Sequence, residues 1–386
     1  MGKLTDWFFK LFIDGKDLDS SVYADLLSVE VEDNDQFADT FTIRIASVRT
    51  SNGDWKYFDD SRFELFNNVV IQVGFANGIK EYLVDGYITN TITRFDPEGQ
   101  NSILELKGMD TTCILNLEER VFKWSNVSDA QIAKRIFDEY GFESQIEETG
   151  IEHREDQTII MQRGTDIQLL RMLAKKNGFE CFVEKDSISG KITGYFRKPV
   201  LDTTPQKMLS VLFGDESNVN RLDVFVDSLR PLTAQSKQIN MAENISEDGN
   251  IKSSSLNKLG QKSLHELIID KVSRLSHPSS EPSRVLISSV VQDTREIQNM
   301  CNSLMDEASW FVKALCEING PAYQSVLRAK RLVLIRGTGK LHSGTYYVSK
   351  VIHIITKDKY IQRMEARRNA VFLLGSENFK DRGGFL

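Results

Sequence analysis

The segment between residues 162 and 196 constrains the fold most, because it signals both ends of a helix and then a change of period. Thr165 and Gln168 have the spacing of a capping box, in which the hydroxyl accepts a helix N–H and the amide side chain reaches back to the cap N–H. Apolar residues recur at helical spacing up to Gly178, and glycine ends helices because it adopts the left-handed conformation cheaply. Two extended stretches follow, Phe179–Val183 and Ile192–Arg197. The segment therefore predicts a helix followed by a β-hairpin, which together make a small α/β unit.

A second helix with equally clear signals precedes this unit. Ser128 and Gln131 have the spacing of another capping box. Val127 and Ile132 fit the hydrophobic staple that fixes how the chain enters a helix. These signals indicate a helix and no particular chemistry. We therefore expect one α/β domain over residues 115–200.

Short strands dominate the sequence before this domain. Phe41, Ile43 and Ile45 alternate strictly with polar residues, a pattern typical of a strand with one buried face. Such stretches recur at regular spacing and are separated by turn residues, which predicts a sandwich or a barrel. We expect residues 1–114 to form a first antiparallel β-barrel.

The C-terminal half shows the same strand pattern with one long interruption. We assign residues 201–233 and 310–375 to a second, discontinuous β-barrel. Residues 234–309 are rich in polar side chains, so we expect a loop-like insertion with an amphipathic helix over Asp293–Ser309. We expect residues 376–386 to form a flexible tail. The predicted class is α+β, mainly β, with two similar antiparallel β-barrels flanking the α/β domain.

Composition argues against several broad classes. The chain has 386 residues, and 48 Lys and Arg against 55 Asp and Glu give a net charge of −7 and no overall basic surface for nucleic acid. Its four cysteines are scattered without a C-x-x-C pair, which predicts buried free thiols. No apolar run reaches the roughly 20 residues of a membrane helix, and the N-terminus lacks the apolar core of a signal peptide.

Sequence motifs for catalysis, cofactors and metals are incomplete. The run Gly337-Thr338-Gly339-Lys340 lacks the other residues of a phosphate-binding loop and predicts a turn. The five histidines include no pair at the i, i+4 spacing of a zinc site, and no Gly-x-Ser-x-Gly elbow occurs. We expect His353 to be a strand residue bonded to backbone or facing solvent. We expect no catalytic, cofactor-binding or metal-binding residues and no enzyme, although the many acidic residues leave a glycosidase-like carboxylate pair open.

Three segments, in their order along the chain, resemble one known family. Residues 165–179 follow the pattern (Ser/Thr)-Asp-x-x-x-Leu-x-x-(Leu/Met)-Ala-x-x-x-Gly-(Phe/Tyr), and residues 337–353 follow Gly-x-Gly and then Ser-Gly-x-Tyr-x-Val-x-x-Val-x-His. Residues 69–110 are similar to the family's first barrel. The chain thus resembles the phage late control D proteins, a contractile-tail baseplate hub family similar to the N-terminal half of VgrG-like spike proteins. The motif residues are Thr165, Asp166, Leu170, Gly178, Phe179, Gly337, Gly339, Gly344, Tyr346, Val348 and His353.

The resemblance implies a structural role. In that family two similar β-barrels of one chain flank an α/β domain, and three chains form a ring whose six barrels match the six-fold tail tube. The implied partners are further copies of the chain in a homotrimer, a hexameric inner-tube protein on one face, a trimeric spike on the other, and baseplate wedge proteins. Because the sequence stops soon after the second motif, we expect the spike to be a separate polypeptide.

The resemblance also implies where the protein acts. We expect assembly in the bacterial cytoplasm and a place in a virion or in an extracellular or membrane-anchored injection particle, with no cofactor, membrane insertion or specific nucleic acid binding. We expect Tyr360–Ala366 to be an edge strand that needs a neighbour. Two alternatives stay open: a cell-wall hydrolase carried by the baseplate, and a receptor- or carbohydrate-binding tail protein.

Overall fold

The computed structural model describes most of the chain. The described residues are 7–97, 101–155, 159–186, 189–240, 245–275, 284–286 and 294–379. Residues 380–386 of the predicted tail and residues 241–244, 276–283 and 287–293 of the predicted insertion lie outside these ranges.

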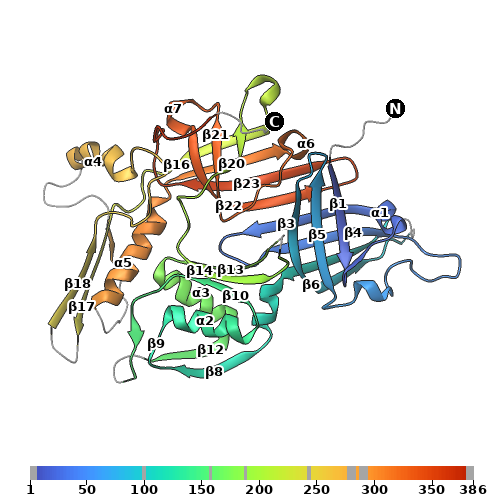
Figure 1. Ribbon diagram of the computed structural model, residues 1–386, viewed down its shortest axis with the longest axis horizontal. Coiled ribbons are helices and arrows are strands. Elements are labelled where there is room, and N and C mark those ends of the chain that lie inside the picture. The colour runs from blue at the N-terminus through green and yellow to red at the C-terminus, as the bar shows by residue number, and fades with distance from the viewer. Residues whose placement is uncertain are drawn as a thin grey trace.

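Most strands belong to one 13-stranded sheet (Figure 1). From the first part of the chain come β1 (Trp7–Ile13), β2 (Lys16–Asp17), β3 (Leu26–Asn34), β4 (Thr40–Ser47), β5 (Asn68–Phe75), β6 (Lys80–Arg94) and β7 (Ser102–Asp110). From the second part come β15 (Gln206–Ser210), β16 (Val219–Val226), β20 (Val312–Asn319), β21 (Arg331–Arg336), β22 (Gly344–Ile355) and β23 (Tyr360–Arg368). We call these two sets the first and the second β unit. Phe41, Ile43 and Ile45 are buried in the first, as predicted.

The two β units repeat one topology. The first has the strand order β3-β4-β7-β6-β5-β1, and the second has the order β16-β20-β23-β22-β21-β15. When the two orders are aligned place by place, the matched strands also occur in the same sequence along the chain. One difference is that β1 runs antiparallel to β5, whereas β15 runs parallel to β21. Each unit buries its own apolar core. The predicted mainly-β α+β class is confirmed, and the two units are similar, but the second is not wholly antiparallel as predicted, because β15 runs parallel to β21.

A single strand pair joins the two units. β22 of the second unit pairs antiparallel with β3 of the first, with Lys350 opposite Asn34 and Ile355 opposite Val29. The sheet path ends at β16 and β2. The prediction that Tyr360–Ala366 forms an edge is therefore wrong, because β23 lies between β22 and β20. Sequence alternation shows a half-buried strand but not which strands flank it.

The α/β region lies against one side of this sheet (Figure 1). Helices α2 (Asp129–Glu139) and α3 (Asp166–Asn177) pack on a three-stranded sheet formed by β10 (Glu143–Ile146), β14 (Ile192–Arg197) and β13 (Glu180–Lys185). Two ribbons complete it: β8 (Glu119–Trp124) with β12 (Ile160–Thr165), and β9 (Val127–Ser128) with β11 (Glu152–His153). The predicted helices and the predicted hairpin, which is β13 with β14, are confirmed.

The predicted loop-like insertion contains regular structure. β17 (Thr233–Asn240) pairs with β18 (Ile245–Ile251) and β19 (Arg284–Leu286). Helix α4 (Leu264–Leu275) follows β18 in the chain, and helix α5 (Thr294–Ser309) packs on β17 and β18. The loop interpretation is wrong for β17, β18 and β19, whereas the amphipathic helix is confirmed as α5. A polar sheet covered by one helix needs few apolar residues, here Ala234, Ile297, Cys301 and Met305.

Short helices complete the fold. They are α1 (Ser20–Asp25), α6 (Gly320–Tyr323), α7 (Gly339–His342) and the 3-10 turns η1 (Ser61–Phe63), η2 (Thr111–Asn116) and η3 (Gly214–Glu216). The four cysteines are free and buried, as predicted. No helix within the described ranges is long and apolar enough to cross a membrane.

The cap of α2 gives a first test. The Ser128 hydroxyl accepts the Gln131 amide at 3.1 Å, and the Gln131 side chain accepts the Ser128 amide at 2.9 Å. Ser128→Ala should therefore lower the free energy of unfolding by about 0.5–2 kcal/mol, whereas Ser128→Asp should keep it, because a carboxylate also accepts the helix amide. Urea denaturation of the three proteins measures this, and an equal loss with Asp would show that Ser128 is not a cap.

Candidate functional site

The first family motif shapes helix α3 and its two ends. Thr165 is the N-cap, and Gly178 ends the helix with a left-handed φ of 68°. The carboxylate of Asp166 is buried and accepts the Tyr140 hydroxyl and the Gln162 side-chain amide, both at 2.8 Å. Leu170 lies in the α/β core, and Phe179 packs against that core. These motif residues organise packing and caps.

The second motif surrounds a buried arginine. Arg368 is fully buried and donates to the carbonyls of Leu259, Ser343 and Phe372 at 3.0, 3.1 and 2.7 Å. Gly344 has a φ of +136°, and a Cβ there would lie 2.5 Å from the Arg368 guanidinium. Tyr346 lies 5.4 Å from the guanidinium, measured from its ring centre. Gly344 and Tyr346 therefore make room for Arg368 at the end of the second β unit.

The remaining residues of that motif lie apart from Arg368. Gly337 approaches the backbone so closely that a Cβ would lie 2.1 Å from the Val211 carbonyl oxygen, whereas a Cβ on Gly339 would meet open space. Val348 is buried in the core of the second unit.

His353 is buried and bonded to a side chain. Its Nδ1 lies 2.9 Å from the hydroxyl of Tyr360. Burial, together with the charge of Arg328, lowers the pKa of His353 to about 3, so the ring is neutral at physiological pH. The prediction of a backbone-bonded or solvent-facing histidine is wrong, because its position on β22 faces the junction of the two units.

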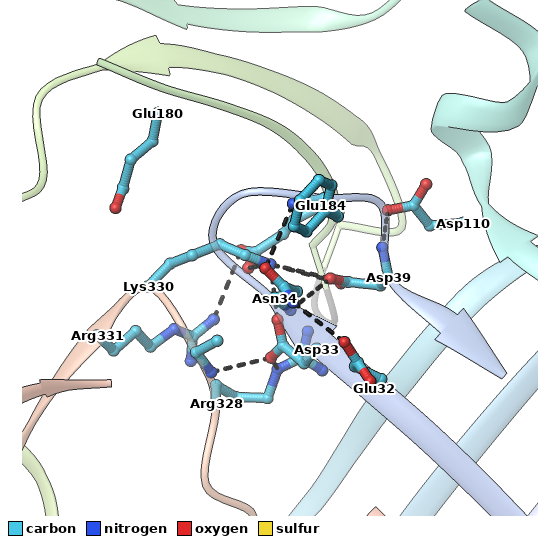
Figure 2. Close-up of polar contacts among 12 residues, drawn as sticks. Glu32, Asp33, Asn34, Asp39, Asp110, Glu180, Glu184, Arg328, Lys330 and Arg331 are labelled. Atoms are coloured by element: carbon cyan, nitrogen blue, oxygen red, sulfur yellow. Dashed lines mark hydrogen bonds and ion pairs between the residues drawn. The ribbon is translucent and has the colours of Figure 1, made fainter. Parts of the chain in front are cut away.

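The most unusual polar arrangement lies at that junction and involves none of the eleven motif residues. We call it the Lys330 cluster: Asp33, Asp39, Asp110, Glu184, Arg328 and Lys330 (Figure 2). The Lys330 ammonium lies 2.6 Å from Asp33, 3.3 Å from Asp39 and 3.7 Å from Glu184. It also lies 4.9 Å from the ring centre of Phe182. Arg328 Nε lies 2.8 Å from the second oxygen of Asp33.

Burial and charge pull the pKa values of this cluster apart. Burial raises the pKa of Asp33, but Arg328 and Lys330 lower it more, so the pKa of this carboxyl lies below its ordinary value. Burial raises the pKa values of Asp39 and Asp110 above the ordinary range. The cluster thus sets two cations among four carboxyl groups, and only Asp33 lies close to both of them.

A second group lies beside it, which we call the Arg367 cluster: Asp35, Glu180, Glu307, Trp310, Tyr347 and Arg367. Figure 2 shows Glu180 set apart from the carboxylates around Lys330. Arg367 Nη2 lies 2.8 Å from Asp35 and 3.8 Å from Glu180, and the guanidinium lies 4.7 Å from the ring centre of Trp310. The Tyr347 hydroxyl donates to Glu180. Burial raises the pKa of Asp35 to about 6 and that of Glu180 to about 7.

Together the two clusters connect four parts of the chain: the two β units, the α/β region and the insertion. Asp33, Asp35 and Asp39 come from the first β unit, Lys330 and Arg367 from the second. The α/β region contributes Glu180 and Glu184 from β13, and α5 contributes Glu307. Buried ion pairs require accurate geometry, so this arrangement fixes the position of each part relative to the others.

Sequence reasoning missed these residues, although β3 carried one signal for Asp33. Val29, Val31 and Asp33 occupy successive inward positions of β3, and all three are buried. A charge at an inward position of a strand was therefore the available signal. Its partner Lys330 is distant in sequence and has a left-handed φ of 62°, which no local pattern predicts.

Two surface grooves lie beside elements of the β units. A groove of about 480 Å³ lies between α1 and the β22–β23 turn and is lined mainly by apolar residues such as Phe9, Tyr23 and Leu27. A smaller one of about 30 Å³ borders the Lys330 cluster. Neither Glu180 nor Asp35, the carboxyl groups with pKa values near neutrality, lines these two grooves. No cluster of His, Cys, Asp and Glu suited to a metal ion occurs within the described ranges.

Removing the central cation should destabilise the junction strongly. Lys330→Met leaves Asp33 and Asp39 buried with one cation fewer, so we expect the free energy of unfolding to fall by about 3–5 kcal/mol. Lys313→Met is the matched control, because Lys313 pairs with Glu365 at 2.6 Å on the exposed surface and should cost at most about 1 kcal/mol. Similar losses for both variants in chemical denaturation would show that the Lys330 cluster is energetically ordinary.

The Arg367 cluster predicts a pH dependence of stability. In the folded protein Asp35 and Glu180 keep protons that the unfolded chain releases above its ordinary pKa values of 3.8 and 4.5. Their contribution is therefore fully present below about pH 4 and is lost as the pH rises to about 7. We expect a fall in the free energy of unfolding on the order of 1–3 kcal/mol across this window. Glu180→Gln, which has no proton to lose, should reduce the slope, and an unchanged slope would contradict the assignment.

One family profile matches the sequence. A family profile described as the Alg8 N-terminal domain matches residues 5–357, which is most of the chain. No curated protein matches the sequence.

Several solved structures share the fold. The 43 kDa tail protein of prophage MuSo2 from Shewanella oneidensis superposes with a TM-score of 0.66 at 12% identity, over 95% of this chain and 99% of that one. A tail protein from Neisseria meningitidis MC58 gives 0.63 at 12% identity, over 95% and 98%. The E. coli c3393 protein, a component of the type VI secretion system, gives 0.53 at 13% identity, over 93% and 76%. The chain therefore belongs to the family of the Alg8 N-terminal domain and has the fold of these phage tail and type VI secretion proteins.

Proposed function

We propose that the protein is a structural hub of a contractile injection machine, and that it adapts a six-fold tail tube to a trimeric spike. The observation that carries this proposal is the duplicated strand order of the two β units. A chain with two equivalent units presents two similar surfaces, so three chains in a closed ring present six. The fold shared with tail proteins supports the same role.

The parts of the chain have different tasks in this proposal. Residues 1–114, and residues 201–233 with 310–375, provide the two units that stack on a hexameric inner-tube protein. Residues 115–200 form the α/β domain between them, and residues 234–309 form an insertion that reaches neighbouring baseplate proteins. The buried charge clusters hold these parts rigid. The role is architectural, without a catalytic site or a resident cofactor.

The remaining partners follow from this role. The face opposite the tube carries a trimeric spike, and wedge proteins surround the ring. Assembly takes place in the bacterial cytoplasm, and the finished hub is part of a virion or of an injection particle. The acidic net charge argues against specific binding of nucleic acid.

Mass measurement tests the proposal. We expect a homotrimer, either from the protein alone or after a trimeric spike protein is added, because obligate interfaces of this kind usually bury well over about 2,000 Å². Native mass spectrometry at moderate salt reads the stoichiometry directly. A monomer under both conditions, or a dimer or six-chain ring within the particle, would overturn the hub assignment.

A further inference from the structure

Four strands of each β unit correspond residue by residue, because two irregularities in their pairing coincide. β6 and β7 shift register at Thr89, and the equivalent pair β22 and β23 shifts at Ser349. β3 and β4 shift register at Leu27, and the equivalent pair β16 and β20 shifts at Asn220. Aligning Thr89 with Ser349, and Leu27 with Asn220, therefore gives each paired residue of these strands an equivalent residue in the other unit.

The pairing of β3 with β22, which joins the two units within one chain, uses a part of β22 that does not pair with β21. β21 pairs with β22 up to Val348, and beyond it Lys350–Ile355 pair with β3. In the first unit the equivalent part of β6 has no strand in the place that β3 takes beside β22, among the described strands. β5 pairs with β6 up to Tyr87, and none of the described strands pairs with that side of Asn90–Arg94.

The equivalent of β3 is an edge strand. β16 ends the sheet path among the described strands, and Phe225 and Val226 at its end are 53% and 46% exposed. A strand edge of eight residues with exposed apolar side chains is a template for another strand, and proteins cover such edges. β16 thus lacks the neighbour that its counterpart β3 has in β22.

We infer that β16 of one copy pairs antiparallel with the C-terminal half of β6 of the next copy, so that the β3–β22 joint recurs between chains. The inference rests on the proposed hub function, because this head-to-tail contact must close into a ring. In the equivalent register Ile92 lies opposite Phe225, and Arg94 lies opposite Asp223. An apolar pair and a pair of opposite charge are both favourable across strands.

Phe66 strengthens this inference, because it is the counterpart of Lys330. Both residues have left-handed φ values, 64° and 62°. The Phe66 amide donates to the carbonyl of Ile88 and the Lys330 amide to that of Val348, both at 2.8 Å, and these two carbonyls are equivalent in the two units. Positive φ is rare for a bulky side chain, so a shared origin of the two turns explains it. Asp33, which pairs with Lys330, corresponds to Val226. Phe66 is 52% exposed, so both apolar counterparts of the buried ion pair lie on the surface.

A cysteine pair tests the register. Residues directly opposite in an antiparallel pair have Cα atoms about 4.5–5.5 Å apart, which suits a disulfide. The native cysteines are buried, so a chain carrying Ile92→Cys and Phe225→Cys should form covalent links between copies under mild oxidation, up to a closed trimer on a non-reducing gel. The control carries Ile92→Cys and Val226→Cys, which places the two sulfur atoms on opposite faces, and should give at least tenfold less product.

The outcomes separate this contact from the hub proposal. A trimer by mass with strong linking only in the first variant supports the inference. A trimer by mass with no link, or with equal links in both variants, overturns the inference and leaves the hub function standing. Phe225→Cys alone linking to itself would indicate a two-fold β16–β16 contact and overturn it too. No trimer under any condition overturns both.

A charge pair tests the counterpart relation independently. Phe66→Lys and Val226→Asp should each raise the dissociation constant of the ring at least tenfold, because each brings one unpaired charge into the contact. The double variant recreates Lys330 and Asp33 at the contact and should recover most of the loss. Met172→Lys, a change at an equally exposed residue of α3, should leave assembly unchanged. Additive losses in the double variant, or no loss in the single ones, would overturn the inference.

Discussion

The ion pair between Lys330 and Asp33 is the interaction on which the arrangement of the whole chain depends. Both side chains are removed from water, and each buried ion costs several kcal/mol unless its partner is well placed. Asp33 meets this requirement with Lys330, Arg328 and the amide of Ala329 at 3.0 Å. A slip of β3 by one residue along β22 would turn Asp33 to the opposite face. The pair therefore fixes the register of the one strand contact that joins the two β units.

The same constraint extends to the α/β region. Glu184 approaches Lys330 from β13, and Glu180 on the same strand meets Arg367 and Tyr347. One short strand thus enters both clusters and sets the distance of the α/β core from the sheet. Such fixed geometry suits the architectural role proposed above, because packed cores with buried charge pairs resist small displacements.

Local signals predicted the elements well and their neighbours poorly. The caps of α2 and α3 could be predicted because Ser128 pairs with Gln131, and Thr165 with Gln168, only three residues further along the chain. The strand alternation of Phe41, Ile43 and Ile45 likewise depends only on a local face. The order of strands could not be predicted this way, and so β23 was placed at an edge although it is interior.

The candidate site was missed for a related reason. Lys330 and Asp33 are almost the length of the chain apart, and sequence contains no direct record of which buried charges meet. The family motifs marked other places: Gly344 and Tyr346 accommodate Arg368, and Gly178 ends α3. Motif residues of this chain therefore report where the backbone is unusual, whereas the junction depends on charges that only the folded sheet brings together.

The contrast between the two joints has a physical cause. The joint within the chain forms once, during folding, and its charges never have to exist unpaired in a folded molecule. A contact between copies must first exist as two separate surfaces in water. Charges there would be well hydrated before assembly and would lose that hydration on burial, whereas Phe66 and Val226 gain from leaving water. Phe66 and Val226, in the places that Lys330 and Asp33 occupy in the other unit, therefore suit the inferred contact between copies, whose two surfaces lie in water before they meet.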